Sequence, residues 1–328
     1  MFYKAELQKK NAEKLEEKLK EYGFPEFMSK YFTVKIRSKY GALKYAYVIH
    51  KFLVYALKSN LIKRNNISEI IPEDFNDIIA EDIDYYLTKE ENSGLSPTTI
   101  GIRRNILSSF WGYLSRQKGC EISEKFFKDV TYRGISTKDR SENLVKKFPT
   151  KDKLQQMEDK ILSSKNEFSR IRNITIFNVL KGTGLRKTEL AGLNMNDLYL
   201  DEEIPFLKTV GKGKYREMEA RRVYLTKSAV DSLKDWLNYR NEISGIIDKD
   251  AIFITKDGTR MTEISIDRFF KTYGCGLTPH MFRHWYASIM SKGNLSFAQQ
   301  QLGHSSPSTI ISNYDNGVYG MVDILESM

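Results

Sequence analysis

The chain has 328 residues, which is long for one compact core and favours two domains. Its 52 basic and 42 acidic residues give a net charge of +10, and such an excess favours a polyanionic partner. No uncharged run approaches the ~18 residues of a membrane-spanning helix, the segment Met1–Tyr22 has no apolar signal-peptide core, and two cysteines cannot form a disulfide framework. We therefore expect a cytoplasmic protein that is not attached to a membrane.

Residues 1–118 are expected to form a small helical domain. Apolar residues recur at three- and four-residue steps from Ala12 to Tyr22, which predicts a charged helical extension over residues 1–23. We expect this helix to pack on its own domain, and a partner-binding helix is the alternative. Ser96 as a cap and Pro97 at the first helical position predict the start of a later helix.

Charge is unevenly distributed along this first domain. Phe27–Ser68 contains nine Lys or Arg residues interleaved with tyrosines and no acidic residue, and Asn92–Cys120 is also free of acid. If these helices lie side by side, they form a positive face suited to double-stranded DNA, and solvated helix faces are the alternative. The candidate DNA contacts are Lys35, Arg37, Lys39, Lys44, Arg103 and Arg104.

The polar segment 119–149 has little periodicity and is predicted to be an interdomain linker. Residues 150–328 follow as a second domain, mainly helical with a small β-hairpin. Its strands are predicted at Glu203–Val210 and Met218–Leu225, on either side of Gly211-Lys212-Gly213-Lys214. The fold class is therefore mainly α with a small β-sheet in the second domain.

Three of the four histidines fall near the carboxyl end, at positions 280, 284 and 304. The three-residue step places His280 and Arg283 on one helical face, where both could reach one anion. A zinc site built from the histidines is the alternative. It is disfavoured because no Glu follows His280 and Arg283 would repel a divalent cation. We expect no metal and no cofactor.

Two further motifs carry candidate chemistry. In Gly182-Thr183-Gly184-Leu185-Arg186, an arginine follows a glycine turn, and Glu189 lies one helical step later, where it can orient Arg186. Downstream, Leu302-Gly303-His304 leads to Tyr314.

The order of these elements, from Arg186 through the lysine hairpin, His280-x-x-Arg283 and Leu302-Gly303-His304 to Tyr314, resembles the tyrosine recombinase or phage integrase family. The resemblance covers the second half of the chain. It implies a site-specific DNA recombinase that cleaves and rejoins strands through a 3′-phosphotyrosine intermediate, without metal or ATP, for the integration and excision or the resolution of DNA elements such as mobile elements. Integration, excision, inversion and dimer resolution all stay open.

The resemblance also implies roles for individual residues. Arg186 and Arg283 would hold the scissile phosphate, Lys212 would be the general acid, and Tyr314 the nucleophile. His280 and His304 would complete the pocket. The helical first half would be the core DNA-binding domain, which closes with the catalytic domain as a two-domain clamp around DNA.

Several alternatives stay open from the sequence. Lys214 competes with Lys212 on the hairpin, and Tyr319 with Tyr314, because the step from His304 to Tyr314 is longer than in many relatives. A type IB-like topoisomerase shares this chemistry, and a non-catalytic DNA-binding regulator shares the scaffold. The resemblance implies a homotetramer on two DNA sites and a monomer in free solution, and it does not identify the target sequence.

Overall fold

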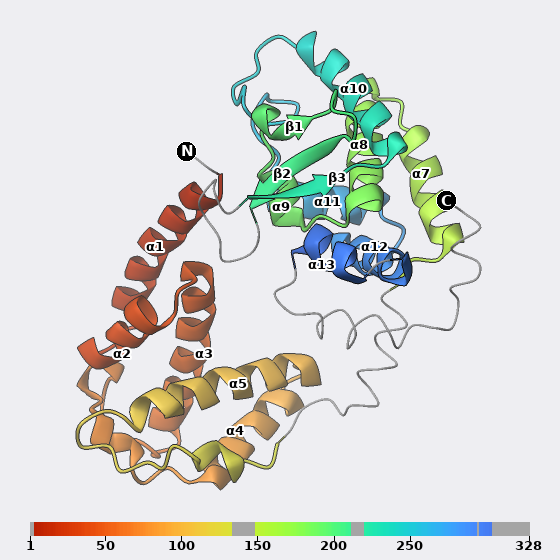
Figure 1. The fold of residues 1–328 in the computed structure, drawn as a ribbon. Coiled ribbons are helices and arrows are strands. Elements are labelled where there is room, and N and C mark those ends of the chain that lie inside the picture. The colour runs from red at the N-terminus through yellow and green to blue at the C-terminus, as the bar shows by residue number, and fades with distance from the viewer. Residues whose placement is uncertain (1–2, 133–147, 211–219, 294, 304–328) are drawn as a thin grey trace. The chain divides into compact units, whose positions relative to one another are not determined.

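The computed structural model describes residues 3–132, 148–210, 220–293 and 295–303. The chain divides into two compact units, Met1–Arg140 and Ser141–Met328 (Figure 1). The fold is mainly helical with a small sheet in the second unit, as the sequence predicts.

The first unit consists of helices packed around an aromatic core. Phe52 contacts Trp111 and Tyr86 edge to face, with ring centroids 5.2 Å apart in both pairs, and all three side chains are buried. The helices are α1 (Tyr3–Glu21), α2 (Glu26–Lys30), α3 (Lys39–Lys58), α4 (Ala80–Asn92) and α5 (Pro97–Leu114), with single turns at Tyr31–Lys35, Ile67–Glu69, Pro72–Phe75 and Phe126–Lys128.

The ends of these helices follow local sequence signals. The Ser96 hydroxyl accepts a hydrogen bond from the Thr99 amide, and Pro97 occupies the first turn of α5, as predicted. Helix α1 buries Leu15 and Leu19 and packs against α3. The predicted helical extension is therefore part of the core of this unit.

Residues 119–132, expected to begin the linker, instead pack on the first unit. Phe127 and Val130 are buried in its core. The Asp84 carboxylate accepts hydrogen bonds from the backbone amides of Thr131 and Tyr132 at 2.9 and 3.0 Å. This segment belongs to the helical unit because it buries apolar side chains there, which composition alone did not reveal.

The structure corrects the expected surface role of Arg103 and shows an internal contact of Arg104. Arg103 is buried and forms an ion pair with Glu90. The Arg104 Nη2 atom donates to the carbonyl oxygens of Phe127 and Val130, at 3.1 and 3.3 Å. Arg103 is therefore on the inward face of α5, whereas Arg104 is half-buried and uses its Nη2 atom to bind the segment around Phe127.

The second unit combines seven labelled helices of the described ranges with a three-stranded antiparallel sheet, in the order β1-β2-β3. The predicted hairpin is confirmed by β2 and β3, and its turn, residues 211–219, lies outside the described residues. The elements are α7 (Lys151–Leu162), α8 (Glu167–Thr183), α9 (Lys187–Ala191), β1 (Leu198–Tyr199), β2 (Phe206–Val210), β3 (Ala220–Tyr224), α10 (Lys227–Asn241), α11 (Glu263–Tyr273), α12 (Pro279–Gly293) and α13 (Leu295–Leu302).

Packing in this unit brings distant segments together. Helix α8 contacts α10 and α12, α12 contacts α13, and α13 contacts β3. The carboxyl end of α8, one strand of the hairpin and the last two labelled helices therefore meet in one region.

Among the residues that the structure describes, none of the helices has the length and apolar composition that a membrane crossing requires.

Candidate active site

A buried carboxylate lies at the centre of the region where these segments meet. Helix α8 ends at Gly184, whose φ of +60° is left-handed, and α9 begins just after Arg186. The Glu189 side chain, only 1% exposed, accepts hydrogen bonds from the Arg186 amide and from Arg186 Nη1, both at 2.9 Å. The three-residue spacing predicted this contact.

A second arginine, which the sequence analysis missed, reaches the same carboxylate from the sheet. The Arg221 Nη1 and Nη2 atoms donate to the two oxygens of Glu189, each at 3.2 Å. Strand alternation was the available signal: Arg221 lies two residues from buried Val223, so both belong to one face of β3, whereas Arg222 points to the exposed face.

Arg283 on α12 is the third guanidinium of this region. It is 2% exposed, and its Nη1 and Nη2 atoms donate to the carbonyl oxygens of Gly184 and Leu302, at 3.0 and 2.6 Å. It therefore ties the turn before Arg186 to the end of α13. One helical turn earlier, His280 is exposed, and its ring contacts the ring of His284 at a centroid distance of 4.4 Å.

The three arginines determine the charge state of Glu189. Burial acts to raise the pKa of this carboxyl, but Arg221, Arg186 and Arg283 lower it to about 2. The carboxylate is thus ionised across the physiological range, and the cluster of three guanidinium groups around one carboxylate carries net positive charge. Such a site attracts an anion and can stabilise negative charge that develops on it.

The described residues hold only part of the predicted site. They bring Arg186, Glu189 and Arg283 together, with His280 on the same helix as Arg283. Lys212, His304 and Tyr314 lie outside the described residues, as do Lys214 and Tyr319. Across the described ranges, no group of three or more His, Cys, Asp or Glu side chains could hold a metal ion.

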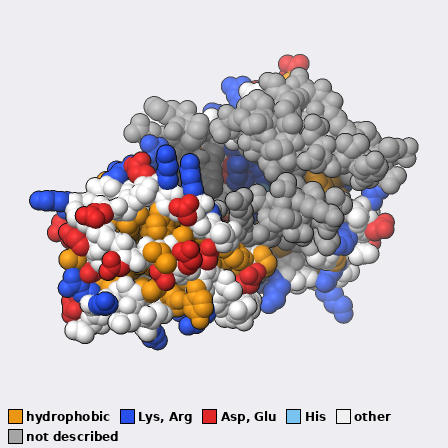
Figure 2. Space-filling model, turned by 90° about the horizontal axis from the view of Figure 1, so that it is seen from below, with side chains coloured by type: hydrophobic (Ala, Val, Ile, Leu, Met, Phe, Trp, Pro, Cys, Tyr) orange, Lys and Arg blue, Asp and Glu red, His pale blue; other side chains and the backbone are white. Residues whose placement is uncertain are grey.

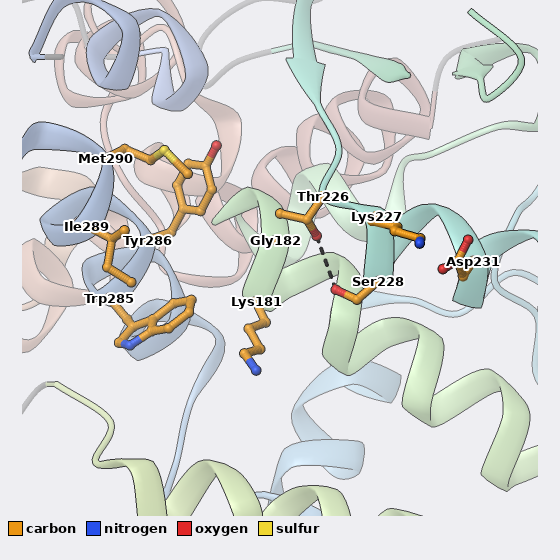
Figure 3. A pocket seen from close by; sticks show the side chains of 10 residues that line it. All are labelled: Lys181, Gly182, Thr226, Lys227, Ser228, Asp231, Trp285, Tyr286, Ile289 and Met290. Carbon is orange, nitrogen blue, oxygen red and sulfur yellow. Dashed lines mark hydrogen bonds between the residues drawn. The ribbon is translucent and has the colours of Figure 1, made fainter. Parts of the chain in front are cut away.

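A separate pocket lies beside this cluster and contains none of the predicted site residues. Figure 3 shows apolar side chains of α12 on one side, the start of α10 on the other, and the end of α8 between them. Tyr286 lines it and also packs against Gly184, where an added Cβ would lie 3.0 Å from the tyrosine side chain. Burial raises the pKa of Tyr286 to about 12, so its phenol stays protonated at neutral pH.

Comparison with known proteins places the chain in a family. The model of the phage integrase family matches residues 148–319. Tyrosine recombinase XerC of Proteus mirabilis is 31% identical over 232 residues, which cover 68% of this chain and 69% of that protein. XerC of Neisseria gonorrhoeae is 36% identical over 147 residues, 42% of this chain and 45% of that protein.

A solved structure has the same fold. The site-specific recombinase XerH, bound to a palindromic difH substrate, superposes with a TM-score of 0.64 at 22% identity, covering 89% of this chain and 80% of XerH. The chain belongs to the phage integrase family of tyrosine recombinases. It is accordingly a site-specific recombinase, an enzyme that cleaves and rejoins DNA.

We expect the ion pairs of Glu189 to contribute to the free energy of unfolding. Glu189→Gln leaves the partly buried guanidinium groups of Arg186 and Arg221 without their counter-charge, so the free energy of unfolding should fall by about 3 kcal/mol. Urea unfolding followed by circular dichroism measures this change, and Glu203→Gln, at an exposed loop position, is the matched control.

The stability difference between wild type and Glu189→Gln should depend on pH, and the lowered pKa of Glu189 gives the direction of this dependence. Because the folded pKa is lowered, the carboxylate stabilises the fold above the usual glutamate pKa of ~4.3, and that contribution is lost as the pH falls toward about 2. The difference between wild type and Glu189→Gln should therefore shrink over this range. A difference that stays constant would contradict the assigned charge state.

Proposed function

We propose that the chain cuts a DNA strand by attack of the Tyr314 phenolic oxygen on a backbone phosphate, which leaves the 3′ phosphate bonded to the tyrosine. The observation that carries the proposal is the cluster of Arg186, Arg221 and Arg283 around one buried carboxylate. A phosphodiester repels nucleophiles through its own charge, so fixed cationic donors are the main requirement of this reaction.

Each predicted residue has a separate task in this proposal. Arg186 and Arg283, with His280 and His304, donate to the non-bridging oxygens and stabilise the charge of the transition state. Lys212 protonates the 5′ oxygen as its bond to phosphorus breaks, because an alkoxide is a poor leaving group.

The covalent step conserves the energy of the broken bond. The phosphorus–oxygen bond to tyrosine forms as the bond to the 5′ oxygen breaks, so no nucleotide has to be hydrolysed. A 5′ hydroxyl of another strand can then attack the phosphotyrosine, which releases Tyr314 and joins the strands.

Double-stranded DNA is the proposed partner of the first unit as well. Lys35, Arg37 and Lys44 are exposed near the start of α3, and the Lys39 Nζ atom donates to the Thr33 carbonyl at 3.0 Å. Figure 2 shows a face of this unit on which acidic and hydrophobic side chains gather, with most Lys and Arg near its edges. The proposed contact residues belong to Phe27–Ser68, a stretch that contains no acidic residue.

The assembly on DNA is proposed to be a homotetramer that holds two recombination sites, formed from monomers in solution. The homotetramer is the state that the resemblance to tyrosine recombinases implies. The structure of XerH bound to its difH substrate supports DNA as the partner. We further propose a cytoplasmic location, because the chain belongs to a family of recombinases that act on DNA.

Tyr314→Phe should abolish the covalent protein–DNA adduct on a nicked substrate that traps the cleaved state, because phenylalanine lacks the attacking oxygen. Denaturing gel electrophoresis detects the adduct. Tyr319→Phe, the matched control, should form it at the wild-type rate. An adduct that persists in Tyr314→Phe and disappears in Tyr319→Phe assigns the nucleophile to Tyr319 instead.

Lys212→Ala should slow cleavage by roughly 100-fold or more, the usual contribution of a general acid. A substrate whose 5′ bridging oxygen is replaced by sulfur should restore the rate, because a thiolate leaves without a proton. Lys214→Ala is the matched control and should show neither effect. If rescue occurs for Lys214→Ala alone, that lysine is the acid.

Replacing Lys35, Arg37, Lys39 and Lys44 together by Gln should weaken DNA binding and flatten its salt dependence, by roughly 0.9 in the log–log slope for each phosphate that the variant no longer neutralises. Fluorescence anisotropy with labelled DNA at several salt concentrations measures the slope. The control replaces the same number of exposed lysines on α1: Lys9, Lys10, Lys14 and Lys20. Equal slopes for the two variants would show that only net charge matters.

A further inference from the structure

We propose that Arg221 is a positioning residue for strand cleavage, which holds Arg186 in place through Glu189 and fixes the end of α13 through the Gln301 carbonyl. The inference rests on the proposed function, because that function assigns Arg186 to the scissile phosphate. Arg221 itself is not proposed to touch DNA.

All three nitrogens of the Arg221 guanidinium take part in hydrogen bonds within the described residues. Nη1 and Nη2 donate to the two oxygens of Glu189 at 3.2 Å each, and Nε donates to the Gln301 carbonyl at 3.0 Å. The planar fork of arginine matches this double contact with a carboxylate, whereas a lysine ammonium acts as a point charge and cannot reproduce it.

Glu189 transmits the effect of Arg221 to Arg186. Its Oε1 atom accepts from both Arg186 Nη1 and Arg221 Nη1, and its Oε2 atom accepts from the Arg186 amide and Arg221 Nη2. The side chain is 1% exposed, so water cannot take the place of a missing partner. Without Arg221, only Arg186 holds the carboxylate, so the acceptor of the Arg186 backbone and guanidinium is less firmly fixed.

The other end of the contact orders the segment before His304. The Gln301 side chain is buried, and its Oε1 atom accepts from the Tyr224 amide at 2.9 Å. Gly303 has a left-handed φ of +62°, and an added Cβ there would lie 3.1 Å from the Arg221 side chain. Arg221 therefore lies between the turn that carries Arg186 and the residue that precedes His304 in the chain.

The neighbouring Arg222 offers a matched control on the same strand. It is exposed, and its guanidinium lies over the Phe206 ring, 4.8 Å from the centroid. Arg222→Gln removes the same charge as Arg221→Gln without touching Glu189 or Gln301.

The test measures adduct formation on the nicked DNA substrate together with the affinity for uncleaved DNA. At saturating DNA, Arg221→Gln should form the adduct about 10- to 100-fold more slowly, with affinity within about twofold of wild type, because misplacement affects the transition state. Arg222→Gln should cleave at the wild-type rate. Arg221→Lys, which keeps the charge and protects the fold, should still be slowed.

Two measurements distinguish a positioning role of Arg221 from a general loss of structure in the variant. In the double variant Glu189→Gln/Arg221→Gln, the rate should be within about threefold of the slower single variant, because both changes break one linkage. The acid limb of the rate against pH should move to higher pH in Arg221→Gln, because Glu189 then faces only Arg186 and Arg283 and its pKa rises. Arg221→Lys should leave that limb nearer its wild-type position.

Hydrogen exchange gives a result that does not depend on catalysis. Amides in residues 184–191 and 299–303 should exchange faster in Arg221→Gln than in Arg222→Gln. The inference would be overturned if Arg221→Gln formed the adduct at a rate within threefold of wild type. It would also be overturned if the rate losses of the two single variants multiplied in the double variant. If wild type forms no adduct at all, the proposed function fails, while faster exchange still shows that Arg221 orders both segments.

Discussion

The second unit depends on an ion cluster in which one buried carboxylate faces three guanidinium groups. Glu189 would be costly to bury alone, and Arg186, Arg221 and Arg283 would repel one another without it. Together they keep the carboxylate charged and leave an excess of positive charge. That excess is suited to binding an anion, and the shared carboxylate fixes where the positive charge lies.

The same cluster joins segments that are far apart in the chain. Arg186 follows the end of α8, Arg221 belongs to the hairpin, and Arg283 lies on α12. Two of these arginines also bind backbone carbonyls at the end of α13. The arrangement keeps donors in fixed positions before substrate arrives, and such preorganisation is the main source of electrostatic catalysis. Membership of the phage integrase family agrees with a phosphate as the anion.

The first unit uses its charges in two ways. Arg103 and Arg104 bind partners inside the unit, and the latter fastens the segment around Phe127 to α5. Lysines near the start of α3 stay exposed beside tyrosines such as Tyr40, which is 57% exposed. Charge in a sequence thus predicts a DNA surface only where the side chains are not used to hold the fold.

Local sequence signals determined the elements and part of the site. The Ser96-Pro97 helix start and the contact of Arg186 with Glu189 involve residues within one helical turn, so spacing was enough to predict them. The inward face of α5 and the burial of Phe127 depended on tertiary packing. The contact between Arg221 and Glu189 also depended on tertiary packing. A strand and a helix that are distant in sequence meet only when the hydrophobic core brings them together.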